Sequence, residues 1–133
     1  MRTTRAACAA GLTACLLISG CGGGGGGGGA KTVTITAPAS GGPASLTVDA
    51  FDVYFVPKTV KAPAGKLDIQ LVEKGSQQHT LVIDGVKGFK LAVGPGNGSD
   101  KGTADLAPGQ YDFYCTIPGH RAQGMAGTIT VAS

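Results

Sequence analysis

The segment from Cys115 to Met125 places a thiol, an imidazole and a thioether at Cys-x4-His-x4-Met spacing, with His120 in the middle. It lies directly before the last apolar run of the chain, and a second imidazole, His79, stands 36 residues upstream of Cys115. These side chains form one metal site only if the fold carries them to a single point. The segment therefore predicts a fold in which four separate side chains converge.

Few other residues of the chain could supply the same kinds of metal ligand. The chain has two histidines, both in the set, and one of its two methionines is the initiator Met1. Of its four cysteines, Cys8, Cys15 and Cys21 all lie within the first 21 residues. One thiolate, two imidazoles and a weak axial thioether form the ligand chemistry of a blue-copper electron-transfer site. We therefore predict a mononuclear copper site built from His79, Cys115, His120 and Met125.

Residues 1–20 predict a lipoprotein signal peptide. A short basic start precedes an apolar stretch from Ala6 to Ile18 that is too short to span a bilayer. The stretch ends in Ile-Ser-Gly-Cys21, which resembles a bacterial lipobox and makes Cys21 the expected lipidation site. Cys15 follows a similar pattern but would leave too short an apolar core. The alternative is a plain secreted protein whose Cys21 is free or paired with Cys115.

Eight consecutive glycines, Gly22–Gly29, and Ala30 follow Cys21. Such a stretch has no side chains to bury, and ordering its backbone costs the most entropy of any sequence. A Gly-rich coil of nine residues has a root-mean-square reach of roughly 15–18 Å. We therefore interpret residues 21–30 as a lipidated cysteine with a flexible tether.

The charge balance excludes one class of partner. Removal of residues 1–20 takes away Arg2 and Arg5, so Lys+Arg falls from 11 to 9 against 8 acidic residues, a net charge of +1. The lysines form no run and have no interleaved aromatic residues, which argues against nucleic-acid binding. The remaining 31–133 is long enough for a single domain with a small core.

From Lys31 onward, short β-branched and aromatic runs alternate with Gly and Pro, as in all-β proteins. Many short strands of this kind predict a sandwich or a barrel. Residues 37–44 fit either a loop or a continuation of the linker, so the domain begins near 31 or near 45. The expected strands are Thr32–Thr36, Ser45–Val48, Phe51–Val56, Thr59–Lys61, Leu67–Glu73, His79–Ile83, Thr103–Leu106, Tyr111–Cys115 and Gly127–Val131.

Strand parity tests whether the four side chains can meet, because side chains alternate between the two faces of a strand. His79 shares a face with Leu81, Cys115 with Phe113, and Met125 with the apolar residues of the last run. Cys115 ends one expected strand, while His79 and Met125 open theirs. Since opening and closing ends adjoin in antiparallel pairs, we expect the four residues to converge at one end of a sandwich.

These features resemble the cupredoxins, the family of type 1 blue copper proteins. The resemblance covers roughly residues 51–131 and rests on Pro57–Gly65, on His79-Thr-Leu-Val-Ile83 and on Tyr114-Cys115-x4-His120-x4-Met125. It implies an all-β Greek-key sandwich of seven or eight strands with copper at one end. It also implies equatorial ligation by His79, Cys115 and His120, with Met125 as the axial ligand.

Three neighbouring residues bear on this assignment. Gln123 offers an alternative axial oxygen ligand, but Met125 has the matching spacing. Thr80 stands where many family members have Asn, and its hydroxyl is expected to tie the His79 strand to the Cys115 segment. Tyr114, beside Cys115, is either an ordinary strand aromatic or a second electron route.

The resemblance implies an electron carrier, with electrons entering or leaving through His120. Together with the lipobox it predicts a monomeric protein, lipid-anchored on the extracytoplasmic side of a bacterial membrane, periplasmic or at the cell surface. Its expected partners are redox proteins such as a membrane cytochrome complex or a terminal oxidase. The alternative is copper delivery without redox exchange. An enzyme is not expected, because no spare histidines exist for a second copper.

Overall fold

The computed structural model describes residues 31–133. The predicted signal peptide, the lipidation of Cys21 and the glycine tether lie outside the described residues. Within residues 31–133, no helix has the length and hydropathy needed to cross a membrane.

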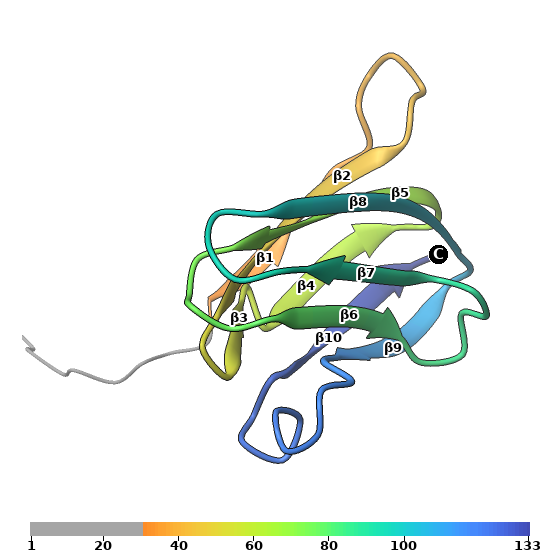
Figure 1. The fold of residues 1–133 in the computed structure, drawn as a ribbon. Coiled ribbons are helices and arrows are strands. Elements are labelled where there is room, and N and C mark those ends of the chain that lie inside the picture. Colours follow the sequence, from red (N-terminus) through yellow and green to blue (C-terminus); the bar gives the residue numbers. More distant parts are fainter. Residues whose placement is uncertain (1–30) are drawn as a thin grey trace, which may run out of the picture.

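Residues 31–133 form two β-sheets packed face to face, as Figure 1 shows. One sheet has six strands in the order β1-β4-β10-β9-β6-β7, and the other has four in the order β3-β2-β5-β8. The strands are β1 (Thr32–Thr34), β2 (Ala44–Phe51), β3 (Tyr54–Val56), β4 (Thr59–Pro63), β5 (Gly65–Glu73), β6 (His79–Ile83), β7 (Lys90–Val93), β8 (Ser99–Leu106), β9 (Gly109–Tyr114) and β10 (Ala126–Ala132).

Alternating burial explains why these segments are strands. Along β2 and β5, every second residue is buried, the pattern of strands with one face on a core. The buried aromatic pair Phe55 and Phe113 lies between the sheets, with ring centroids 5.7 Å apart. The chain changes sheet at several connections, so sequence neighbours are often not sheet neighbours. The predicted all-β sandwich is confirmed.

Most strand boundaries differ from the sequence prediction by a few residues, and three differences are larger. Strand β7 was not predicted; it is a four-residue strand on one edge of its sheet, paired only with β6 in the described chain. Strand β8 begins at Ser99 rather than Thr103, because its polar first half pairs with β5 at the edge of the other sheet. The expected strand Phe51–Val56 is interrupted by a turn that separates β2 from β3.

The number of strands also differs from the expectation. The resemblance implied seven or eight strands, whereas residues 31–133 contain ten, two of which are only three residues long. One of these is β1, which pairs in parallel with β4 through Thr32–Thr34. The segment 31–44 therefore contains a strand followed by an exposed loop that protrudes beside the start of β2 (Figure 1).

The segments that contain the predicted metal ligands meet at one end of the six-stranded sheet. Strands β9 and β10 are antiparallel, with Tyr114 opposite Ala126, so the loop between them extends from this end of the sandwich (Figure 1). Strand β6 runs antiparallel to β9, with Val82 opposite Tyr114. Its first residue, His79, therefore lies beside the segment that directly follows β9.

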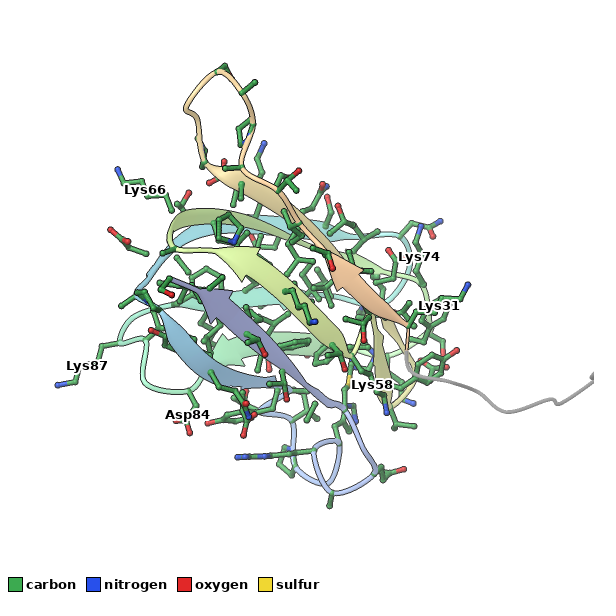
Figure 2. All side chains as sticks on the ribbon, turned by 180° about the vertical axis from the view of Figure 1, so that it is seen from behind. Lys31, Lys58, Lys66, Lys74, Asp84 and Lys87 are labelled. Carbon is green, nitrogen blue, oxygen red and sulfur yellow. The ribbon has the colours of Figure 1, made fainter. Side chains whose placement is uncertain are left out.

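Lysines of the described residues 31–133 lie on several sides of the sandwich. Figure 2 shows the labelled Lys31, Lys58, Lys66, Lys74 and Lys87 distributed around the periphery of the sandwich. This distribution agrees with the near balance of acidic and basic residues in 31–133.

Candidate metal centre

Three of the predicted ligands meet at this end of the sandwich. One ligand atom from each of His79, Cys115 and His120 lies within 4.8 Å of the other two. The Cys115 Sγ is 3.7 Å from His120 Nδ1, and the two imidazole rings have centroids 5.2 Å apart. All three residues are buried, and His120 retains 8 % exposure. The convergence expected from parity and strand direction is thus present for these three residues.

Met125 closes the same loop. Its backbone N–H donates to the His120 carbonyl at 3.0 Å, and its own carbonyl accepts from the Cys115 N–H at 3.1 Å. The side chain is fully buried in the same apolar cluster as Cys115. Gln123, the alternative axial residue, is exposed, and its amide donates to the Gly119 carbonyl at 3.4 Å. Burial therefore favours Met125, whose ligation stays a prediction.

The loop that carries His120 is folded by its own backbone. The His120 N–H donates to the Ile117 carbonyl at 3.1 Å, and the Gly124 N–H donates to the Arg121 carbonyl at 3.0 Å. Gly119 and Gly124 have φ angles of 84° and 102°, in the left-handed region that favours glycine. These turns fix the imidazole between the two sulfur-bearing residues.

Thr80 connects two of the ligand segments, as the sequence predicts. Its Oγ1 accepts a hydrogen bond from the Thr116 N–H at 2.8 Å and lies 2.8 Å from the Thr116 hydroxyl. Its backbone N–H donates to the Cys115 Sγ at 3.5 Å, and its Oγ1 lies 3.7 Å from the same sulfur. Thr80 thus ties strand β6 to the segment that follows β9, and its backbone N–H donates to the sulfur.

Electrostatics at the site keep His79 neutral. Burial lowers the pKa of His79, and the nearby Glu73 carboxylate opposes this only in part. A neutral imidazole is the form that binds a metal. Neither ring nitrogen of His79 has a hydrogen-bond partner in residues 31–133, although the side chain is fully buried. Buried polar atoms are rarely left unpaired, and a metal ion would satisfy one of these nitrogens.

The donor set fits copper better than zinc. A thiolate with two imidazoles and a soft thioether matches the trigonal blue-copper arrangement, whereas structural zinc sites take four strong ligands. The residues His79, Cys115, His120 and Met125 could hold such an ion, and Thr80 could supply hydrogen bonds that stabilise the charge on the sulfur.

The sequence analysis missed one residue beside the centre. Glu73, the last residue of β5, is only 1 % exposed, and its Oε2 lies 3.9 Å from His79 Nε2. A signal was present, because Glu73 has the same strand parity as the buried Leu67, Ile69 and Leu71. A charged residue at an inward-facing position indicates a polar partner inside the fold.

Comparisons with known proteins agree with this geometry. Residues 29–131 match the family model of the cupredoxin-like domain. The chain is 33 % identical over 106 residues to a plastocyanin from Prochlorothrix hollandica. The aligned region covers 71 % of this chain and 77 % of that protein.

Solved structures give the same answer for the fold. The reduced auracyanin of Roseiflexus castenholzii is 26 % identical, with a TM-score of 0.60, over 67 % of this chain and 97 % of that one. Auracyanin A, a blue copper protein from Chloroflexus aurantiacus, is 21 % identical, with a TM-score of 0.58 over 68 % and 100 % of the two chains, and supports the fold alone. The chain therefore belongs to the cupredoxin-like family.

Proposed function

We propose that this protein is a blue-copper electron carrier. The observation that carries the proposal is the buried cluster of His79, Cys115 and His120, whose ligand atoms lie within 4.8 Å of one another. The similarity to a plastocyanin and to auracyanins supports it.

The protein residues have distinct roles in this proposal. His79, Cys115 and His120 would be the equatorial ligands, and Met125 the weak axial one. Bound copper would supply a one-electron couple between Cu(I) and Cu(II). The surrounding chain excludes water, since three of the four side chains are 1 % exposed or less. Ligands held by packed strands and by a hydrogen-bonded loop need little rearrangement when the charge changes, which keeps the barrier to electron transfer low.

His120 is the proposed port for electrons. It is the most exposed of the four residues, at 8 %, and Pro118, Gly119 and Ala122 around it are exposed small or apolar residues. Such a surface allows a partner to approach closely and to leave quickly, as small redox interfaces require.

Tyr114 offers the second route that the sequence left open. Its ring is partly buried, and the Arg121 guanidinium carbon lies 3.9 Å from the ring centroid. This cation–π contact holds the ring in place beside Cys115. The contact also explains the position of Tyr114 structurally, so electron transfer through it remains the weaker proposal.

We further propose that Cys21 is lipidated and that the glycine tether holds the domain on the extracytoplasmic face of a bacterial membrane. In the sheet, Thr32 of β1 lies level with Thr59, and Thr128 of β10 lies level with the same residue. Strand β1 therefore begins at the end of the sandwich that carries the metal centre, which supports exchange with membrane-bound redox partners. Replacing Cys21 with Ala should move the protein from the detergent phase to the aqueous phase, and unchanged partition would contradict the anchor.

Copper delivery without redox exchange is the competing function. A carrier should keep its copper in both oxidation states. In the proposed site, four side chains of the protein would ligate the ion and would leave no open coordination position for exchange or catalysis. We expect voltammetry to show a reversible one-electron wave, with copper retained in the presence of a weaker chelator. Ready loss of copper to that chelator from the reduced protein would favour delivery.

A further inference from the structure

A buried carboxylate lies directly behind the proposed copper ligand His79. Glu73 ends β5, its side chain has no solvent exposure, and its Oε2 has no hydrogen-bond partner in residues 31–133. Removing an ionised carboxylate from water costs several kcal/mol unless the protein compensates for it. A group this costly needs a partner, and the two ring nitrogens of His79 are the other buried side-chain atoms without one in the described chain.

The carboxylate is held in a fixed orientation. Its Oε1 accepts the Gly75 N–H at 2.6 Å, and the Glu73 N–H donates to the Gly98 carbonyl at 2.8 Å. The second oxygen, Oε2, then faces His79 Nε2 at 3.9 Å. This distance is longer than a hydrogen bond, and a shift of about 1 Å would bring it into the usual range.

An imidazole that ligates a metal through one nitrogen donates its other N–H to an acceptor in almost every known site. Here the acidic side chains face Nε2, which leaves Nδ1 as the nitrogen available for the metal. We propose that Glu73 is a positioning residue that accepts the Nε2–H of His79 and fixes the tautomer whose Nδ1 lone pair binds copper. This inference rests on the proposed function, because it takes His79 as a copper ligand.

Asp52 provides a natural comparison at the same distance. Its Oδ1 also lies 3.9 Å from His79 Nε2, but its side chain is 44 % exposed. Both of its oxygens already accept hydrogen bonds from Ser76, from the N–H at 2.8 Å and from the hydroxyl at 3.0 Å. The Ser76 N–H lowers the pKa of this carboxyl. Asp52 thus anchors the loop before His79, and water screens its charge from the imidazole.

The same three residues could be interpreted as a second metal site, because atoms of Asp52, Glu73 and His79 lie within 4.8 Å of one another. A metal there would need the Nε2 lone pair, and therefore the opposite tautomer of His79. The tautomer thus separates the two interpretations.

The test begins with the metal-free full chain, in which the histidine tautomers are measured by ¹⁵N NMR at neutral pH. The chain has two histidines, so a His120→Asn variant assigns both sets of signals. We expect His79 to carry its proton on Nε2 alone in the wild type, and to lose this single tautomer in Glu73→Leu, whose side chain has no acceptor. A wild-type His79 protonated on Nδ1 would overturn the inference.

The second readout is the reduction potential of the copper-loaded protein. Glu73→Gln removes a buried negative charge near the metal, which should raise the potential, whereas Asp52→Asn should shift it much less. Equal shifts in the two variants would contradict a specific role for Glu73. If copper forms no coloured centre at all, the proposed function fails, while the tautomer in the metal-free protein still decides this inference.

Discussion

At the scale of single residues, Thr80 links strand β6, which begins at His79, to the segment after β9 that contains Cys115. Its hydroxyl is within hydrogen-bonding distance of both the N–H and the hydroxyl of Thr116, and it lies 3.7 Å from the Cys115 Sγ. One side chain therefore fixes the spacing of β6 and β9 and also contacts the sulfur. Substitutions at Thr80 should therefore change both the free energy of unfolding and the reduction potential of bound copper.

Thr80→Val keeps the shape of the side chain but removes its hydroxyl. We expect a loss of unfolding free energy of about 0.5–1.5 kcal/mol, because the partly buried Thr116 N–H loses its acceptor. The reduction potential should fall, since a thiolate with fewer hydrogen-bond donors stabilises Cu(II). Chemical denaturation and voltammetry measure the two effects. Thr128→Val removes only a partly exposed hydroxyl bonded to Asp112 and should alter neither quantity appreciably.

Met125→Leu tests the axial position. The change conserves volume in a fully buried site, so the metal-free protein should lose less than about 1.5 kcal/mol. The copper protein should keep its colour, which comes from the thiolate, while the potential rises because a donor to Cu(II) is lost. Loss of the colour in this variant would show that Met125 has a larger role than a weak axial ligand.

The buried His79 should make the metal-free protein sensitive to acid. Burial lowers its pKa below the ordinary 6.5, so the unfolded state binds more protons than the folded state below that pH. Stability is therefore complete above about pH 6.5 and should decline as the pH falls through the range down to the lowered folded pKa. Urea titrations between pH 8 and pH 5 measure the slope, which His79→Leu should flatten. A slope that persists in this variant would assign the effect to other groups.

The site could be predicted from residue type and spacing, but its surroundings could not. His79, Cys115 and His120 were identified because sulfur and imidazole side chains are scarce in this chain. Glu73 was missed because its role depends on a packing distance between two strands, β5 and β6, that belong to different sheets. Parity alone would have marked it as an inward-facing acid.

At the scale of strands, β10 lies close to its neighbours at Gly127. A Cβ at this position would clash with the Phe113 ring and lie 2.5 Å from the Lys58 carbonyl oxygen. Phe113 is itself a buried residue of the core, so its ring has little room to move. The glycine therefore permits the close approach of β4, β9 and β10 beside the metal centre.

Gly127→Ala should consequently destabilise the protein by about 1–3 kcal/mol, the usual cost of overpacking. Thermal unfolding of the metal-free protein measures this loss. Gly94→Ala is the matched control, because a Cβ there would meet no atom within 4 Å. Equal stability of the two variants would contradict the close packing at Gly127.

Strand prediction succeeded where burial alternates and failed at the sheet edges. The strand Leu67–Glu73 lies within β5, whose every second residue is buried. By contrast, β7 alternates in burial but has only four residues, and the first half of β8, Ser-Asp-Lys-Gly, contains no apolar residue. Both lie at a sheet edge and are defined mainly by backbone pairing with one neighbour. Backbone pairing leaves no pattern of side chains in the sequence.

At the scale of the whole molecule, the hydrophobic core and the metal ligands occupy different parts of the sandwich. The core between the sheets holds the strands, while the metal ligands lie at the end where β6 begins and β9 finishes (Figure 1). Bound copper should also add to stability, because an ion that binds only the folded state contributes about 4 kcal/mol at a thousand times its dissociation constant.

The central claim is that His79, Cys115, His120 and Met125 form one type 1 copper site. Addition of one equivalent of Cu(II) to the purified protein, followed by visible and paramagnetic-resonance spectroscopy, tests it most directly. We expect an intense blue or green colour that saturates at one copper per chain and is absent in Cys115→Ser. A wild-type protein that stays colourless with copper bound, or a Cys115→Ser variant that keeps the colour, would contradict it.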